Sequence, residues 1–218
     1  MSAVLNKNHY LFTSESVGEG HPDKLCDQVS DAILDYALSL DKNAHVACET
    51  FSTTNFILVG GEIGFQDPKV NLDEFNSNVE KIARQVALDI GYDSAEKGLD
   101  GKNCIFENRL HAQSADINQG VVGKGLDEYE GKQGAGDQGM MFGFACNETP
   151  SLMPAPVYYS HQILLKAHEL RHSGAIKWLR PDAKSQVTIE YDGFKPVRID
   201  TVVVSHQQIG RASCRERV

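Results

Sequence analysis

The stretch Glu19-Gly20-His21-Pro22-Asp23-Lys24 constrains the fold of the chain most. It joins an irregular, Ser- and Gly-rich segment to the first clear helix of the sequence. Pro22 suits the first turn of a helix, where its missing N–H costs no hydrogen bond. Beyond it, apolar side chains recur at helical spacing along one face, at Leu25, Val29, Ile33, Tyr36 and Leu40. The pattern therefore predicts a helix that begins near Pro22.

The start of that helix predicts an anion site. Free N–H groups and the positive end of the helix dipole attract phosphate, and His21 and Lys24 add donors and charge. Asp23 opposes a phosphate unless a divalent cation lies between them, as oxygen-ligated Mg²⁺ typically does. The stretch thus favours a metal–polyphosphate site. The alternative is a set of solvated first-turn residues with His21 as a helix cap.

The composition excludes several classes of protein. A net charge of -9 argues against a nonspecific nucleic-acid binder, which would carry a basic face. No apolar run reaches membrane-spanning length and residues 1–9 lack a signal pattern, so we expect a cytoplasmic protein with no membrane partner. The 5 cysteines are scattered without a Cys-x-x-Cys pair, which indicates neither a disulfide framework nor a zinc ribbon.

Strand and helix patterns alternate after the first helix. Residues 45–51 and 56–63 are predicted to form a hairpin, and each strand carries one acid, Glu49 or Glu62, for which a solvent-facing position is the simplest reading. Residues 71–90 predict a helix with a capping box at its start and Gly91 at its end. A further strand is expected over residues 103–112.

A glycine-rich loop from Gln113 to Gly134 follows, and a loop of this length is usually a lid, a binding loop or a linker. Gly134 to Gly139 has the letters of the dinucleotide fingerprint G-x-G-x-x-G. The fingerprint requires a preceding strand and a following helix, whereas a loop precedes it here and a strand-like run, residues 140–146, follows. Its glycines more plausibly allow close approach to a ligand, with Asp137 nearby, or form a tight turn.

The last third predicts a helix over residues 157–173, then a hairpin of strands 186–191 and 197–205. His168 and His172 lie one turn apart on this helix, but they lack the Glu and the third ligand of a zincin, which favours solvated or capping histidines. Lys184, just before a strand, is a candidate phosphate ligand or an ordinary surface lysine. The order of elements indicates two α+β units separated by the glycine-rich loop.

The final ten residues, 209–218, have a different character. Their amino-acid sequence resembles the translation of a sequencing adapter. The adapter would be joined to a reading frame that is interrupted near Gln208. A native transcript that encodes the same ten residues would refute this hypothesis. We therefore exclude Cys214 and the nearby arginines from functional reasoning.

Several long segments, in this order, resemble the S-adenosylmethionine synthase (methionine adenosyltransferase) family, in its bacterial branch. They are Phe12 to Lys24, Ala47-Cys48-Glu49-Thr50, Val59 to Ile63, Gln113 to Val121, Gly134 to Gly139 and Arg180 to Gln186. The resemblance implies an α+β fold of pseudo-repeated domains, each with a mixed sheet and helices on one face. The expected divisions are an N-terminal domain at 9–115, a mobile loop at 116–133, part of a central domain at 134–208, and the tail.

The resemblance implies synthesis of S-adenosylmethionine from ATP and methionine, with hydrolysis of the triphosphate. By the family's pattern His21 is catalytic and faces ATP, Asp182, Ala183 and Lys184 bind ATP, and Glu62, Gln113 and Asp137 lie at methionine. Asp23 would hold Mg²⁺ and Glu49 would hold K⁺. The family also implies a homodimer or a dimer of dimers with shared active sites.

The resemblance also implies residues that this chain lacks, because family members continue through a third domain that completes the site. We therefore expect the 218-residue chain alone to be inactive, and poorly folded beyond about Gln133 because a truncated domain leaves apolar strand faces uncovered. Two alternatives remain: a noncatalytic ATP- or partner-binding fragment of the same fold, and a dinucleotide-binding oxidoreductase that rests on Gly134 to Gly139 alone.

Overall fold

The computed structural model describes residues 9–113 and 139–208. Their backbone divides into two compact units. We call residues 25–113 and 139–141 the contiguous unit, and residues 9–24 and 142–208 the split unit, because its two segments lie far apart in sequence.

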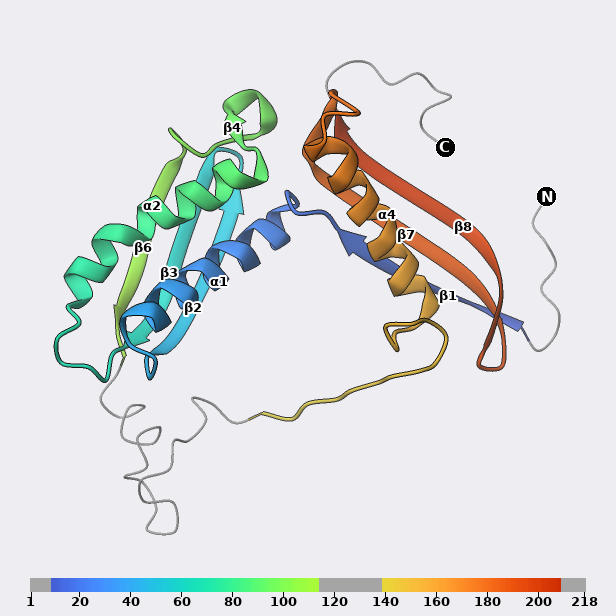
Figure 1. Ribbon diagram of the computed structural model, residues 1–218, viewed down its shortest axis with the longest axis horizontal. Coiled ribbons are helices and arrows are strands. Elements are labelled where there is room, and N and C mark those ends of the chain that lie inside the picture. The colour runs from blue at the N-terminus through green and yellow to red at the C-terminus, as the bar shows by residue number, and fades with distance from the viewer. Residues whose placement is uncertain (1–8, 114–138, 209–218) are drawn as a thin grey trace, which may run out of the picture. The chain divides into compact units, whose positions relative to one another are not determined.

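The contiguous unit packs two helices on one face of a three-stranded sheet (Figure 1). Its main elements are α1 (Pro22–Leu40), whose first residues belong to the split unit, β2 (His45–Thr53), β3 (Phe56–Gly64), α2 (Leu72–Ile90) and β6 (Ile105–Ala112). The sheet is mixed, since β2 pairs antiparallel with β3, and β3 pairs parallel with β6. A small addition follows α2: β4 (Asp93–Ser94), the 3₁₀ turn η1 (Ala95–Lys97) and β5 (Leu99–Asp100).

Apolar periodicity places both helices on the sheet. Leu25, Val29 and Ile33 of α1 are buried, as their spacing predicts, whereas Tyr36 is half-buried and Leu40 is exposed. In α2 the buried side chains are Phe75, Val79, Ala83, Ala87 and Ile90. The predicted ends of α2 are confirmed: the Asn71 side chain accepts the N–H groups of Asp73 and Glu74, and Gly91 adopts a left-handed conformation with φ 107.

The split unit is built on an antiparallel sheet in the order β1-β7-β8, crossed by one helix. Its elements are β1 (His9–Val17), α4 (Ala155–His172), β7 (Leu179–Asp192) and β8 (Lys195–Gln208). Val187, Ile189 and Tyr191 of β7 form a small core with Ala155 of α4. The predicted hairpin is confirmed, with Gly193 at φ 59 in its turn.

Two local predictions were wrong. The lead before Glu19 is not irregular: residues 9–17 form β1, whose partner β7 is far away in the sequence and leaves no local signal. Residues 140–146 form no strand, although the run is apolar, and Met140 and Met141 are exposed. A strand is defined by a hydrogen-bonded neighbour, and composition alone does not supply one.

No helix in the described part of the chain is long and apolar enough to cross a membrane.

Candidate functional site

The loop between β1 and α1 is held against β7 by close backbone contact. The Gly18 N–H donates to the Ala183 carbonyl oxygen over 2.7 Å. At Gly20 a Cβ atom would lie 2.4 Å from Pro181 Cβ and 2.5 Å from its carbonyl carbon, so only glycine fits there without a shift. These contacts bring the N-terminus of α1 beside the Pro181–Lys184 stretch of β7.

His21 caps the first turn of α1. Its Nδ1 accepts the backbone N–H of Asp23 over 3.2 Å, and the nearest Asp23 carboxylate oxygen, Oδ2, lies 3.8 Å from the same nitrogen. Because Nδ1 is an acceptor here, the neutral imidazole carries its proton on Nε2, which is therefore the donor. The Asp23 side chain is 84% exposed, whereas that of His21 is only 25% exposed.

Asp182 is a half-buried carboxylate within range of the His21 charge. Burial raises the pKa of Asp182 above its ordinary value of 3.8, while the charges of His21 and His206 and the Ala183 N–H oppose that rise. A carboxylate kept partly out of water in this way is poised to accept hydrogen bonds from a polar ligand or to face a cation.

Lys184 lies beside the same loop, at the end of the paired region. The backbone of Lys184 pairs with Val17 of β1, and the Lys184 ammonium nitrogen lies 2.7 Å from Glu15 Oε2. Both side chains are about half exposed. An exposed pair of this kind is weak and can be exchanged for a more highly charged anion such as a phosphate.

The contiguous unit carries Glu49 and Glu62 on the sheet face opposite the helices. Ile57, Val59 and Ile63 of β3 are buried, so the alternation of the strand places Glu62 on the other face. Glu49 pairs with Gly60 and Glu62 with Ala47, which puts the two acids diagonally opposite on one face. The expected solvent-facing position is confirmed for Glu49, which is exposed, and Glu62 is intermediate.

Gln113 joins Glu62 at the same end of the sheet. Its N–H donates to the Ile63 carbonyl over 3.0 Å, and its Oε1 lies 3.4 Å from His45 Nδ1. Beside them, Gly61 has φ 127, and a Cβ there would lie 1.9 Å from the Ala47 oxygen. The close pairing of β2 and β3 that aligns the acids therefore requires glycine at this position.

The predicted residues thus fall into two groups. His21, Asp23, Asp182, Ala183 and Lys184 belong to the split unit, and Glu49, Glu62 and Gln113 belong to the contiguous unit. Asp137 and the loop at 116–133 lie outside the described residues. Sequence reasoning missed Glu15 as the partner of Lys184, because that pairing depends on the β1–β7 register.

Both described regions match models of known domains. Residues 9–115 match the N-terminal domain of S-adenosylmethionine synthetase, and residues 132–217 match its central domain. The chain belongs to the S-adenosylmethionine synthetase family. The central-domain match runs into the tail, so the adapter origin of residues 209–218 stays a prediction.

Curated relatives of the S-adenosylmethionine synthetase family agree with this assignment. The chain is 58% identical over 196 residues to the S-adenosylmethionine synthase of Treponema denticola, and 57% identical over 197 residues to those of two strains of Treponema pallidum. Each alignment covers 90% of this chain but 48% of the relative, so the chain spans about half the length of the curated relatives it matches. Synthases of this name are methionine adenosyltransferases.

Proposed function

We propose that the protein to which this chain belongs makes S-adenosylmethionine from ATP and methionine, and that the split unit binds the triphosphate. The observation that carries the proposal is the close contact of Gly18 and Gly20 with β7, which sets the N-terminus of α1 beside Asp182. Family membership supplies the reaction class, and the local chemistry of the residues supports it.

In the proposed reaction the methionine sulfur attacks the ribose C5′ of ATP. A C–S bond forms, the C5′–O bond breaks, and its electron pair leaves with the triphosphate. A thioether is already a nucleophile, so the chain need not supply a base, and the demand is for donors and positive charge around the leaving group. His21 Nε2–H, the positive end of the α1 helix dipole and Lys184 suit that demand.

The second half of the proposed reaction is the hydrolysis of the triphosphate. Water attacks a terminal phosphorus atom of the triphosphate, the P–O bond to the bridging oxygen breaks, and its electron pair leaves with diphosphate as phosphate forms. The N-terminus of α1 would hold the terminal oxygens during this step, while Asp182 accepts hydrogen bonds from the nucleotide. This order of events keeps the charged leaving group in place until the sulfonium product has formed.

The donor set fits the metals that the family resemblance implies. Mg²⁺ commonly takes one or two carboxylates together with phosphate oxygens and water, and Asp23 is an exposed carboxylate at the phosphate-binding end of α1. Bound Mg²⁺ would neutralise charge that develops on the triphosphate. Glu49 offers the exposed oxygen ligands that K⁺ requires.

Methionine would bind in the contiguous unit, at the end of the β2–β3–β6 sheet where Glu62 and Gln113 lie. The Glu62 carboxylate suits its ammonium group, and the Gln113 amide suits a further hydrogen bond. We add Asp137 to this group, as the family resemblance implies. We further propose that the protein lies in the cytoplasm and forms a homodimer or a dimer of dimers whose active sites are shared between subunits. Native mass spectrometry tests the assembly.

The test begins with the natural gene, sequenced across codon 208, and uses the full protein that it encodes. We expect ATP- and Mg²⁺-dependent formation of S-adenosylmethionine, detected by chromatography. Removing the His21 donor in His21→Ala should lower kcat by about 10²–10³-fold, the usual cost of one lost donor at a developing anion. Asp23→Asn should raise the Mg²⁺ concentration needed for half-maximal rate.

Asp31→Asn is the matched control, because Asp31 is an exposed carboxylate two turns further along α1. It should leave both parameters unchanged. ATP binding without product formation by the full natural protein would support the noncatalytic alternative. Unchanged activity in His21→Ala and Asp23→Asn would contradict the assigned roles.

A further inference from the structure

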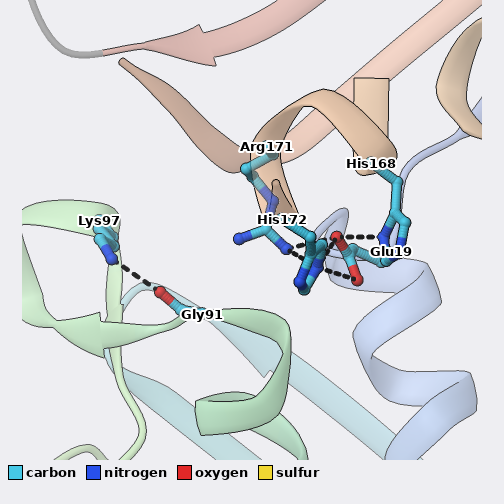
Figure 2. A network of polar contacts seen from close by, with 6 residues as sticks. All are labelled: Glu19, Gly91, Lys97, His168, Arg171 and His172. Atoms are coloured by element: carbon cyan, nitrogen blue, oxygen red, sulfur yellow. Dashed lines mark hydrogen bonds and ion pairs between the residues drawn. The ribbon is translucent and has the colours of Figure 1, made fainter. Parts of the chain in front are cut away.

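A carboxylate and two imidazoles meet in the split unit outside the proposed ATP-binding residues. Glu19 comes from the loop before α1, and His168 and His172 lie one turn apart on α4, 149 residues away in the case of His168 (Figure 2). Glu19 Oε1 lies 2.8 Å from His168 Nδ1 and 3.0 Å from His172 Nε2. The sequence shows the histidine pair, but the third ligand appears only in the fold.

The spacing of these atoms suits a single small cation. One ligand atom from each residue lies within 4.8 Å of the others. Ligands bound at about 2.0–2.1 Å around a tetrahedral Zn²⁺ lie roughly 3.3 Å apart. The observed separations of 2.8 Å, 3.0 Å and, for Glu19 Oε2 and His172, 3.4 Å need only small side-chain adjustments to reach that value.

The site also has access and an open position. The side chains of His168 and His172 are 47% and 43% exposed, and that of Glu19 is 21% exposed. An ion can therefore enter from solvent and keep water as a fourth ligand. Two imidazoles with one carboxylate select Zn²⁺, Co²⁺ or Ni²⁺ over Mg²⁺ and Ca²⁺, which prefer oxygen ligands only.

Arg171 already places positive charge at this point. Its Nη2 contacts Glu19 Oε1 and lies 2.7 Å from His172 Nε2. A guanidinium group can only donate and a carboxylate can only accept, so His172 Nε2 can hydrogen-bond only one of Arg171 and Glu19 at a time. A metal ion held by the Glu19 carboxylate and the neutral His172 ring would satisfy both groups at once, and it would compete with Arg171 for them.

We propose that Glu19, His168 and His172 bind Zn²⁺ or a similar divalent transition cation, which displaces the Arg171 guanidinium and ties the loop before α1 to α4. The inference does not depend on the proposed reaction, because it uses different residues and a different class of ion. It predicts metal binding even if S-adenosylmethionine synthesis fails.

The test is a Co²⁺ titration of the metal-free full protein that the natural gene encodes, followed by visible absorption and by displacement with Zn²⁺. We expect the visible bands of four-coordinate Co²⁺ without a thiolate charge-transfer band. His168→Gln and His172→Gln should each weaken Zn²⁺ binding at least about tenfold, since even outer-shell changes cost that much. Both side chains are exposed on a helix, so glutamine there should not disturb folding.

His161→Gln is the matched control, because His161 lies on the same helix and bonds Ser16 instead of Glu19. It should bind Zn²⁺ as the unmodified chain does. Arg171→Gln should tighten binding by removing the competing charge, and Zn²⁺ should raise the unfolding temperature in a concentration-dependent way. Equal binding by His168→Gln and the unmodified chain, or binding that persists in urea, would overturn the proposal.

Discussion

At the scale of single residues, the proposed triphosphate site requires a glycine, which has no side chain, as much as it requires His21 and Asp182. Gly20 lies so close to Pro181 that a Cβ would overlap its backbone. That contact, together with the Gly18 hydrogen bond to Ala183, fixes how near His21 comes to Asp182. A glycine here is therefore a requirement of packing between distant segments.

Gly20→Ala should destabilise the split unit by about 1–3 kcal/mol, the usual cost of inserting a carbon into a tightly packed position. The urea dependence of unfolding, followed by circular dichroism, measures the effect. Gly143→Ala is the control, because a Cβ there meets nothing within 4 Å. An equal stability of the two variants would show that the loop is not held against β7 as described.

At the scale of elements, Asp41 joins the end of α1 to the segment after β3. Its N–H donates to Ala37, continuing the helix by one bond, and its carboxylate accepts the N–H groups of Asn43, Gln66 and Asp67 over 2.5–2.9 Å. These donors, with Asp67 first, lower the pKa of Asp41 below its ordinary value of 3.8. The carboxylate thus stabilises the fold only while it is ionised.

The sign of the pH effect follows from that lowered pKa. The unfolded chain binds the Asp41 proton more readily, so the contribution is complete above about pH 3.8 and is lost as the pH falls through the lower folded value. Asp41→Asn places an amide donor among N–H donors and should lower the urea midpoint at neutral pH. Below the folded pKa the variant and the unmodified chain should converge; a constant difference across the range would contradict this account.

At the scale of the whole molecule, solution behaviour depends on the apolar surface that the split unit leaves uncovered. Val202, Val203 and Val204 of the edge strand β8 are 43%, 46% and 49% exposed, and Phe12 of β1 is 48% exposed. Exposed apolar edge strands promote association between chains. Poor folding of the chain beyond about Gln133 stays a prediction.

Val203→Glu should reduce concentration-dependent self-association of the 218-residue chain, because it places a charge on the exposed edge of β8. Light scattering across a concentration series measures the change. Thr201→Glu adds the same charge at a nearby exposed position of β8 without removing an apolar side chain. If both variants reduce scattering equally, net charge and not the apolar edge governs association.

The sequence by itself determined the elements whose signals are local. The spacing of Leu25, Val29 and Ile33 predicts α1, and Asn71 and Gly91 mark the ends of α2, because helix packing and capping act over a few residues. The motifs around His21 and Asp182 also indicate the family before any contact is known. The family models and the relatives confirm that assignment.

Only the tertiary structure decided which distant segments meet. Thr13 of β1 bonds Thr188 of β7 across 175 residues, and that pairing sets Glu15 against Lys184. Helix α4 bonds both strands through Ser160, and its packing sets His168 against Glu19. Strand pairing satisfies backbone groups that any residue carries, so side-chain identity along β1 does not name its partner. The close approach at Gly20 follows from the strand pairing and the Glu19 cluster from the packing of α4, and no local pattern in the chain encodes either contact.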